Sequence, residues 1–291
     1  MQLVLHADAH VTDEDRLLKS LIVNQRLLSE RGTQAPFPKA YRRLLRDILH
    51  AARQSGITAD TREVILDALG FETPPDRLIL SNPGFFGTPK MAASGGEFYS
   101  SATPRLEVFR QIFEQDEIEL YFAICNPATF LPAILPQTKF DSMATYLGGS
   151  DPREMRWSEM ISRLRVARPD IPITVWCNED TPMIWGEILR EMAGIDATVP
   201  LEGEHSLLRE IMSSTGMARF EAYLEGHPDM TEMQKRRVIA AFLDKFAEED
   251  AIEEEVDMPG WDEALVDDLT EIYDEDIYTI GRIPGITLIT P

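Results

Sequence analysis

Residues 3–21, LVLHADAHVTDEDRLLKSL, decide the fold of this 291-residue chain. The apolar run at the start of this stretch, Gln2–His6, is typical of a short buried strand. After a polar turn, leucines recur at helical spacing until Gly32 is reached. Thr12 in the N-cap position and Asp15 three residues later predict that a helix begins here and ends at Gly32. The chain therefore opens with a strand–turn–helix unit.

The same alternation of short apolar strands and amphipathic helices continues along the chain. Further strands are predicted at Arg77–Ser81, Glu119–Cys125 and Ile173–Cys177, and helices at residues 41–52, 61–69, 105–115, 128–135, 155–167 and 182–193. This alternation predicts an α/β fold with a mostly parallel central sheet flanked by helices. We expect this core over residues 1–200. Residues 201–291 are expected to form a mainly helical region packed on the core, with a short terminal strand in GITLITP.

The charge of the chain limits its partners. The formal net charge is -22 at pH 7, so nucleic acid and anionic membrane surfaces are poor partners. Sixteen Asp and Glu residues lie between Asp244 and Asp276, where apolar residues at helical spacing indicate a folded, acidic helical region. We expect the partner to be a protein or a small molecule, and a homo-oligomer is compatible with this composition.

The sequence favours a cytoplasmic location. Its apolar runs are shorter than a membrane-spanning helix, so we expect no membrane insertion. Its N-terminus lacks the basic segment and apolar core of a secretory signal. Cys125 and Cys177 lie in strand-like segments, and we interpret them as buried apolar side chains in a reducing compartment. A catalytic thiol at Cys125 stays open as an alternative, since that role requires a neighbouring His or helix N-terminus.

Three turns follow predicted strands at one edge of the sheet. Ligands of open parallel sheets bind at the carboxyl ends of the strands, which points to Ala7–Asp13, Asn82–Lys90 and Asn126–Thr129. The second of these turns opens a segment rich in Gly, Ser and Pro, residues 82–104. A segment of this length inside a compact domain is either functional or mobile.

The first turn is predicted to hold phosphate poorly. Glycines let backbone N–H groups approach an anion closely at the start of a helix, and this turn has none. Asp13, Glu14 and Asp15 instead place up to three negative charges at the positive end of the helix dipole. If the amides from Ala9 to Glu14 form an open concave nest, an anion site survives. If Asp or Thr side chains fill the nest, the site is closed.

The three turns together resemble those of bacterial PAPS-dependent sulfotransferases, which have a P-loop-type α/β fold. The resemblance covers roughly residues 1–190, and members typically begin LHIGxxKTGTTxLQ, the loop that binds the donor's 5′-phosphosulfate. Positions that fit this pattern are Leu5, His6, Thr12 and Leu17. The positions that depart from it are Asp8 and Asp13 for the two glycines, Val11 for the lysine, and Glu14 for the following hydroxyl residue.

The other two elements of the family pattern are matched in their apolar residues but not in the residues that contact phosphate. RLILS resembles the family strand that ends in Ser, here Ser81, but Asn82 follows it in place of the frequent Glu. ELYFAICNPATFLPA resembles the segment whose strand-end Arg and later Ser bind the donor's 3′-phosphate. Those two positions are Cys125 and Ala133.

The resemblance implies the sulfotransferase scaffold without its donor-binding residues. At about 1.5–3 kcal/mol per charge-assisted hydrogen bond, two or three missing contacts weaken donor binding by several orders of magnitude. We therefore expect no cofactor, and a binding or regulatory protein without PAPS-dependent activity. The second hypothesis is an active sulfotransferase or related transferase with a rearranged donor site, which would use PAPS. Lys90, Arg105 or Arg153 would then supply the missing charge.

The third hypothesis is a metal-dependent hydrolase. His6, Asp8 and His10 follow one another at every second position, so on an extended segment their side chains point to one side. His and Asp are good ligands of divalent metals, and Asp13 or Glu14 could add a carboxylate. The stretch HADAHVTD is also similar to the Asp-Ala-His-x-Asp motif of ureohydrolases, but their Ser-x-Asp-x-Asp segment is not in the sequence. The alternative is a buried His6 at the strand end and a His10 on the surface.

Overall fold

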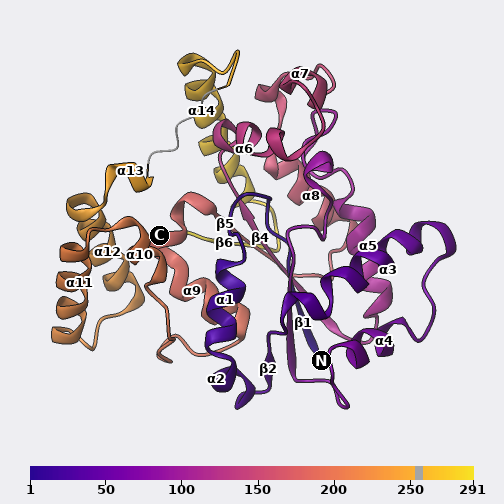
Figure 1. Ribbon diagram of the computed structural model, residues 1–291, viewed down its shortest axis with the longest axis horizontal. Helices are drawn as coiled ribbons and strands as arrows, with labels where there is room; N and C mark the ends of the chain where they lie inside the picture. Colours follow the sequence, from indigo (N-terminus) through magenta and orange to yellow (C-terminus); the bar gives the residue numbers. More distant parts are fainter. Residues whose placement is uncertain (253–257) are drawn as a thin grey trace.

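A computed structural model describes residues 1–252 and 258–291 of the chain (Figure 1). Its centre is one sheet of six strands in the order β2-β3-β1-β4-β5-β6, in which all neighbours are parallel. The predicted α/β fold with a mostly parallel sheet is thereby confirmed. The strands are β1 Gln2–His6, β2 Thr33–Gln34, β3 Arg77–Ser81, β4 Glu117–Ile124, β5 Ile173–Cys177 and β6 Ile286–Ile289.

The first strand lies inside the sheet, between β3 and β4. His6, the last residue of β1, lies opposite Ser81 of β3 and Tyr121 of β4. The chain leaves β1 toward β2 and β3 on one side and later enters β4 on the other. The crevice beyond the carboxyl end of β1 is therefore a topological switch point, where ligands of such sheets bind.

The strands present alternate side chains to the two faces of the sheet. In β1, Leu3 and Leu5 belong to one buried cluster and Val4 to the other, as the two-residue period of a strand requires. The first cluster is the larger one. It includes residues of α3 Arg42–Ser55, α4 Thr61–Ala68, α5 Ala102–Ile112, α6 Pro127–Ile134, α8 Trp157–Ala167 and α14 Glu263–Ile280. The second includes residues of α1 Arg16–Val23, α2 Gln25–Ser29 and α9 Thr181–Ala193.

The helix predicted after β1 is divided in two. α1 begins at Arg16 and ends before Asn24, and α2 begins directly after that residue. The side-chain amide of Asn24 donates to the carbonyl oxygens of Ser20 and Glu202, at 2.8 and 2.9 Å. The prediction of one continuous helix from Thr12 is therefore wrong. The leucine periodicity runs on through the break, because both helices pack on the same face of the sheet.

The described helices of the C-terminal region lie in two places. α10 Ser206–Ile211, α11 Ser214–Gly226, α12 Glu232–Phe246 and α13 Glu249–Ile252 lie beside α9 (Figure 1, orange). A small third cluster around Met217 and Phe220 holds this group together. In contrast, α14 packs on α6 and α8, and β6 pairs with β5. Residues 253–257 of the acidic stretch lie outside the described residues.

The segment rich in Gly, Ser and Pro packs against the core between β3 and α5. Phe85, Phe86, Phe98 and Tyr99 are all buried there. The remaining short elements are α7 Met143–Tyr146 and the 3-10 helices Pro38–Ala40, Pro89–Met91, Leu135–Gln137, Pro152–Glu154 and Asn178–Asp180. Within the described residues, we find no helix that combines the length and the apolar character needed to span a bilayer.

Candidate functional site

The turn between β1 and α1 first continues along β4 and then reverses into the helix. The amides of Ala7 and Ala9 donate to the carbonyl oxygens of Tyr121 and Ala123, both at 3.1 Å. The Thr12 hydroxyl donates to the carbonyl oxygen of Ala9 at 2.7 Å. The prediction of Thr12 as the N-cap is therefore wrong, because its hydroxyl is used inside the turn and α1 begins later.

Asp13 supplies the acceptor at the start of α1. Its Oδ1 accepts a hydrogen bond from the amide of Leu17 at 2.7 Å. Asp15 occupies the N-cap position but makes no cap bond with its side chain. Its carboxylate instead accepts two hydrogen bonds from the guanidinium of Arg42, one of them 2.9 Å long. The carboxylate of Asp13 thus occupies the start of α1, while the amides of Ala9 and His10 donate to Ala123 and Tyr99.

The backbone of the turn is strained at three positions. Val11, Glu14 and Asp15 have φ values of 61°, 50° and 64°, in the left-handed region that favours glycine. Such conformations cost on the order of 1–3 kcal/mol each, and they are least favourable for a β-branched residue such as Val11. The turn thus follows a backbone path suited to glycine, although it contains none.

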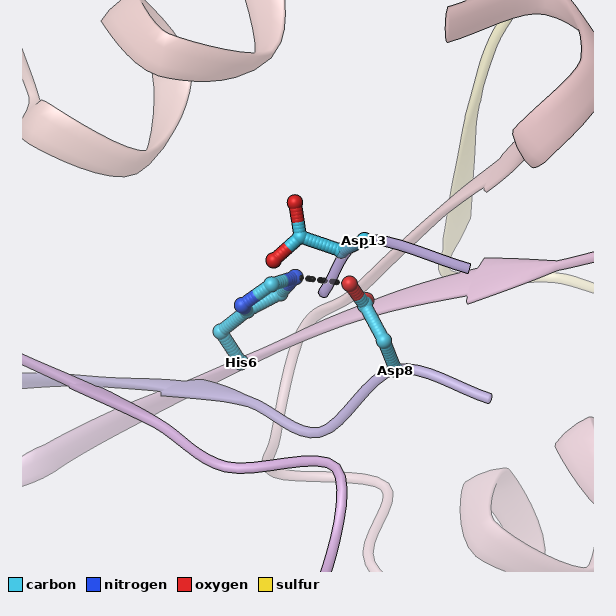
Figure 2. Close-up of side chains that lie close together, drawn as sticks. All are labelled: His6, Asp8 and Asp13. Carbon is cyan, nitrogen blue, oxygen red and sulfur yellow. Dashed lines mark ion pairs between the residues drawn. The ribbon is translucent and has the colours of Figure 1, made fainter. Parts of the chain in front are cut away.

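Inside this turn, the side chains of His6, Asp8 and Asp13 converge (Figure 2). The Nε2 atom of His6 lies 2.5 Å from the Oδ2 atom of Asp8. One donor atom from each of the three side chains lies within 4.8 Å of the others. Among the described residues, this is the one group of His, Cys, Asp and Glu side chains with the spacing needed to hold a metal ion.

A second polar atom fixes the orientation of each of these side chains. The Nδ1 atom of His6 lies 2.8 Å from the hydroxyl oxygen of Ser81. The Oδ1 atom of Asp8 accepts a hydrogen bond from the amide of Ala123 at 2.9 Å. Asp13 is held in the same way by the first turn of α1. Within the described chain, Nε2 of His6 and Oδ2 of Asp8 have no hydrogen-bond partner beyond their ion pair with each other.

The charged groups of the cluster shift one another's ionisation. Burial lowers the pKa of His6, but the charge and close contact of Asp8 and the charge of Asp13 bring it above its ordinary value. Burial raises the pKa of Asp13 to about 6, against the opposing charge of His6. The hydrogen bonds from Arg42 hold the pKa of Asp15 below its ordinary value. Asp15 therefore has a cationic partner of its own, while Asp8 and Asp13 share His6.

The side chain of His10 is held by Tyr99. Its amide and its Nδ1 atom contact the hydroxyl oxygen of Tyr99 at 2.8 and 2.6 Å, and the two rings stack. His10 lines one cavity together with His6 and Asp8, but it is not one of the three side chains that converge. His10 is also buried rather than on the surface. Burial lowers its pKa to about 4.

Three cavities surround the turn at the carboxyl edge of the sheet. The first measures about 310 Å³, and its lining includes Asp8, Asp13, Arg16, Trp176, Glu179 and Glu210. The second measures about 350 Å³, and its lining includes Val11, Cys125, Asn126, Ala133 and Glu179. The third measures about 180 Å³, and its lining includes His6, Asp8, Val11, Asp13, Glu14 and Ser81. Because the cavities share walls, the turn stands at the centre of one composite crevice.

Comparison of the chain with protein-family models, with curated proteins and with solved structures finds no match in any of the three. The ligand class of the crevice is therefore inferred from the geometry and charge of its own residues.

The remaining residues named from the sequence lie at or away from this crevice. Cys125 and Cys177 are buried and are not joined by a disulfide, which agrees with their interpretation as apolar side chains. Lys90 lies over the ring of Phe140 with Nζ 5.9 Å from its centre. Arg105 donates to the carbonyl oxygens of Gly84 and Phe85, and Arg153 pairs with Asp268 at 2.8 Å.

One acid of the crevice, Glu179, was missed by sequence reasoning. Its Oε1 accepts a hydrogen bond from the amide of Asn126 at 2.7 Å, and its Oε2 accepts one from the hydroxyl of Tyr273 at 3.0 Å. Burial raises its pKa above the ordinary value. Glu179 is the second residue after β5, so the rule that ligands bind at strand ends, applied to this fourth predicted strand, could have found it.

Proposed function

We propose that this chain is a binding protein with a sulfotransferase-like α/β scaffold and without PAPS-dependent activity. Its crevice takes a ligand other than a phosphate ester. The observation that carries this proposal is the hydrogen bond from the amide of Leu17 to Oδ1 of Asp13. A helix start binds an anion through its free amides and the positive end of its dipole. In this chain a carboxylate of the protein itself takes that place.

The charges that line the crevice support the same proposal. Asp8, Asp13, Glu179 and Glu210 all line the 310 Å³ cavity. Arg16 is the cation among its lining residues, and its guanidinium lies 3.3 Å from Glu210. A phosphosulfate carries several negative charges, so it would meet carboxylates where a donor site offers cations.

The other two hypotheses find less support. A rearranged donor site needs a new cation in the crevice, and Lys90, Arg105 and Arg153 do not line any of the three cavities around the turn. The hydrolase was expected to use His10, which is engaged with Tyr99 instead. We therefore prefer a binding protein to either enzyme.

Calorimetric titration with PAP, the desulfated donor product, tests the proposal. We expect no saturable heat with the wild-type protein at low ionic strength, where charge-assisted binding is strongest. An active sulfotransferase titrated in the same buffer shows that the nucleotide is competent. The proposal is overturned if PAP binds with a micromolar Kd and Asp13→Ala changes that Kd.

A further inference from the structure

We propose that His6, Asp8 and Asp13 bind one divalent transition-metal ion, of the Mn²⁺ or Zn²⁺ kind, beyond the carboxyl end of β1 (Figure 2). This inference rests on the proposed function, because it assigns a cation to a crevice that we propose does not take phosphate. It also differs from the trio expected from spacing, since Asp13 stands in place of His10.

The inference starts from two buried atoms that have only each other as a polar partner. Nε2 of His6 and Oδ2 of Asp8 are 2.5 Å apart, on side chains that are 2% and 3% exposed. Beyond this ion pair, neither atom has a hydrogen-bond partner within the described chain. A metal ion held by these two atoms and the Asp13 carboxylate would take the place of the ion pair.

The distances allow an ion to enter with little movement. Metal–ligand bonds of about 2.0–2.2 Å at tetrahedral angles place two ligand atoms roughly 3.3 Å apart. His6 and Asp8 would therefore separate by less than about 1 Å from their present contact. The third side chain already lies within reach, because the donor atoms of the group span no more than 4.8 Å.

The surrounding hydrogen bonds orient each side chain as metal ligands are usually oriented. A metal-bound imidazole normally gives its second N–H to a neighbouring acceptor, which fixes the tautomer and the direction of the ring. The hydroxyl of Ser81 can take that N–H from Nδ1 of His6, which leaves the Nε2 lone pair for the ion. Backbone amides likewise hold Oδ1 of Asp8 and of Asp13, which leaves the second oxygen of each carboxylate for the ion.

The charge of the cluster matches a dication. Arg42 pairs with Asp15 and so neutralises that carboxylate of the turn. Two carboxylates then remain beside one imidazole, which binds a metal in its neutral form. One doubly charged ion therefore compensates Asp8 and Asp13.

The donor set and the space indicate the class of ion. Imidazole suits Zn²⁺ and Fe²⁺, whereas carboxylates suit Mn²⁺ and Mg²⁺, so one nitrogen and two oxygens favour an ion that accepts both. Three protein ligands leave at least one position open for water or for a ligand. All three side chains line the 180 Å³ cavity, which has room for such a molecule.

Metal titration of an untagged protein tests this site. The protein is stripped with a chelator, and MnCl₂ or ZnCl₂ is then added at pH 7.5 while bound metal and the Tm are measured. We expect about one equivalent of ion and a Tm that rises with its concentration. Asp8→Asn and Asp13→Asn each keep an oxygen for the backbone amide but lose the charge, and should weaken binding by more than about 100-fold. Ser81→Ala, which leaves the ligands in place, should weaken it by about 10-fold.

Glu14→Gln is the matched control. It removes one carboxylate from the same turn, but the Glu14 side chain is 73% exposed and lies outside the cluster, so binding should stay close to wild type. In Mn²⁺ EPR, the nitrogen coupling of a bound imidazole should be present in the wild type and absent in His6→Gln. This spectrum identifies the ligand even where a variant is less stable.

Two results would overturn the inference. One is a wild-type protein that binds neither ion above about one tenth of an equivalent. The other is binding that Asp8→Asn, Asp13→Asn and Glu14→Gln leave equally unchanged, since the ion would then lie elsewhere. PAP is titrated in parallel. PAP binding refutes the proposed function, whereas the absence of both PAP and metal binding refutes the metal site alone.

Discussion

The Oδ1 atom of Asp13 accepts a hydrogen bond from the amide of Leu17 at 2.7 Å, at the start of the helix that follows the first strand. The bond satisfies one of the free amides of α1 from within the protein. It also fixes the carboxylate beside His6 and Asp8, with which it forms the acidic cluster. One side chain thus closes the helix start to an external anion and brings a second carboxylate to the buried imidazole.

The left-handed backbone at Glu14 gives the first prediction. Its φ is 50° and its side chain is 73% exposed, so a substitution there changes backbone strain more than packing. Glu14→Gly should stabilise the protein relative to Glu14→Ala by about 1 kcal/mol, because only glycine adopts this conformation without cost. Urea denaturation of the two variants measures the difference. Equal midpoints would show that this residue is not left-handed in solution.

The contact between Arg42 and the turn gives the second prediction. Its guanidinium reaches both the Asp15 carboxylate and the carbonyl oxygen of Ser81, the latter at 3.0 and 2.9 Å. Arg42→Ala should lower the free energy of unfolding by about 2 kcal/mol, since it leaves part-buried acceptors without a donor. Arg42→Lys should recover only part of this loss, because an ammonium cannot reproduce the planar fork.

A residue of the same helix is the control for that measurement. The side chain of Arg43 is 86% exposed, so Arg43→Ala should change the stability by no more than about 0.5 kcal/mol. Equal losses from Arg42→Ala and Arg43→Ala would mean that the charge of α3 matters and the contact with the turn does not.

The strands could be predicted from the sequence because buried parallel strands are apolar runs with clear ends. Arg77–Ser81 and Ile173–Cys177 have the predicted bounds, and each is followed by Asn. Thr33–Gln34 is too short to show any periodicity. The break between α1 and α2 at Asn24 could not be predicted from the sequence either, because one hydrogen-bond partner of Asn24, Glu202, lies 178 residues away.

The candidate site could be predicted in part for the same reason. His6 and Asp8 lie on the extended stretch that runs alongside β4, where alternate side chains point to the same side. Asp13 was a candidate only as an added carboxylate, because its place depends on how the turn closes. His10 was assigned to the wrong neighbours, since its partner Tyr99 comes from a loop 89 residues later. Local spacing fails where a distant side chain decides the orientation.

Glu179, an acid that lines two of the cavities, gives the third prediction, a dependence of stability on pH. Its pKa is raised above the ordinary 4.5, chiefly by burial, and the charge of Asp180 adds to this while the hydrogen bonds from Asn126 and Tyr273 oppose it. The folded protein therefore holds this proton more tightly than the unfolded chain. The stability that results is present below pH 4.5 and is lost as the pH rises through the folded-state pKa.

Glu179→Gln should remove this loss. The Tm of the variant minus that of the wild type should be more positive at pH 7.5 than at pH 4, since an amide does not ionise. Glu210→Gln, in the same cavity with a side chain 52% exposed, should show a smaller difference between the two pH values. A wild-type pH profile identical to that of Glu179→Gln would contradict the prediction.

The last prediction introduces into the turn the residues of the sulfotransferase pattern that the sequence resembles. Asp8→Gly, Val11→Lys and Asp13→Gly combined should give a protein that binds PAP measurably, whereas we expect no PAP binding by the wild type. A lysine on the phosphate adds a charge-assisted hydrogen bond of about 1.5–3 kcal/mol. The two glycines remove the carboxylates that line the cavity and free the amide of Leu17.

The control for this variant separates charge from geometry. Val11→Lys alone adds the same positive charge but keeps both carboxylates, so it should bind PAP at least about 10-fold more weakly than the triple variant. The Tm of each variant shows whether it is folded before the titration is interpreted. A folded triple variant that binds no PAP would mean that the backbone of this turn cannot bind the donor even with the residues of the sulfotransferase pattern. The backbone path suited to glycine at Val11, Glu14 and Asp15 would then belong to the acidic cluster itself.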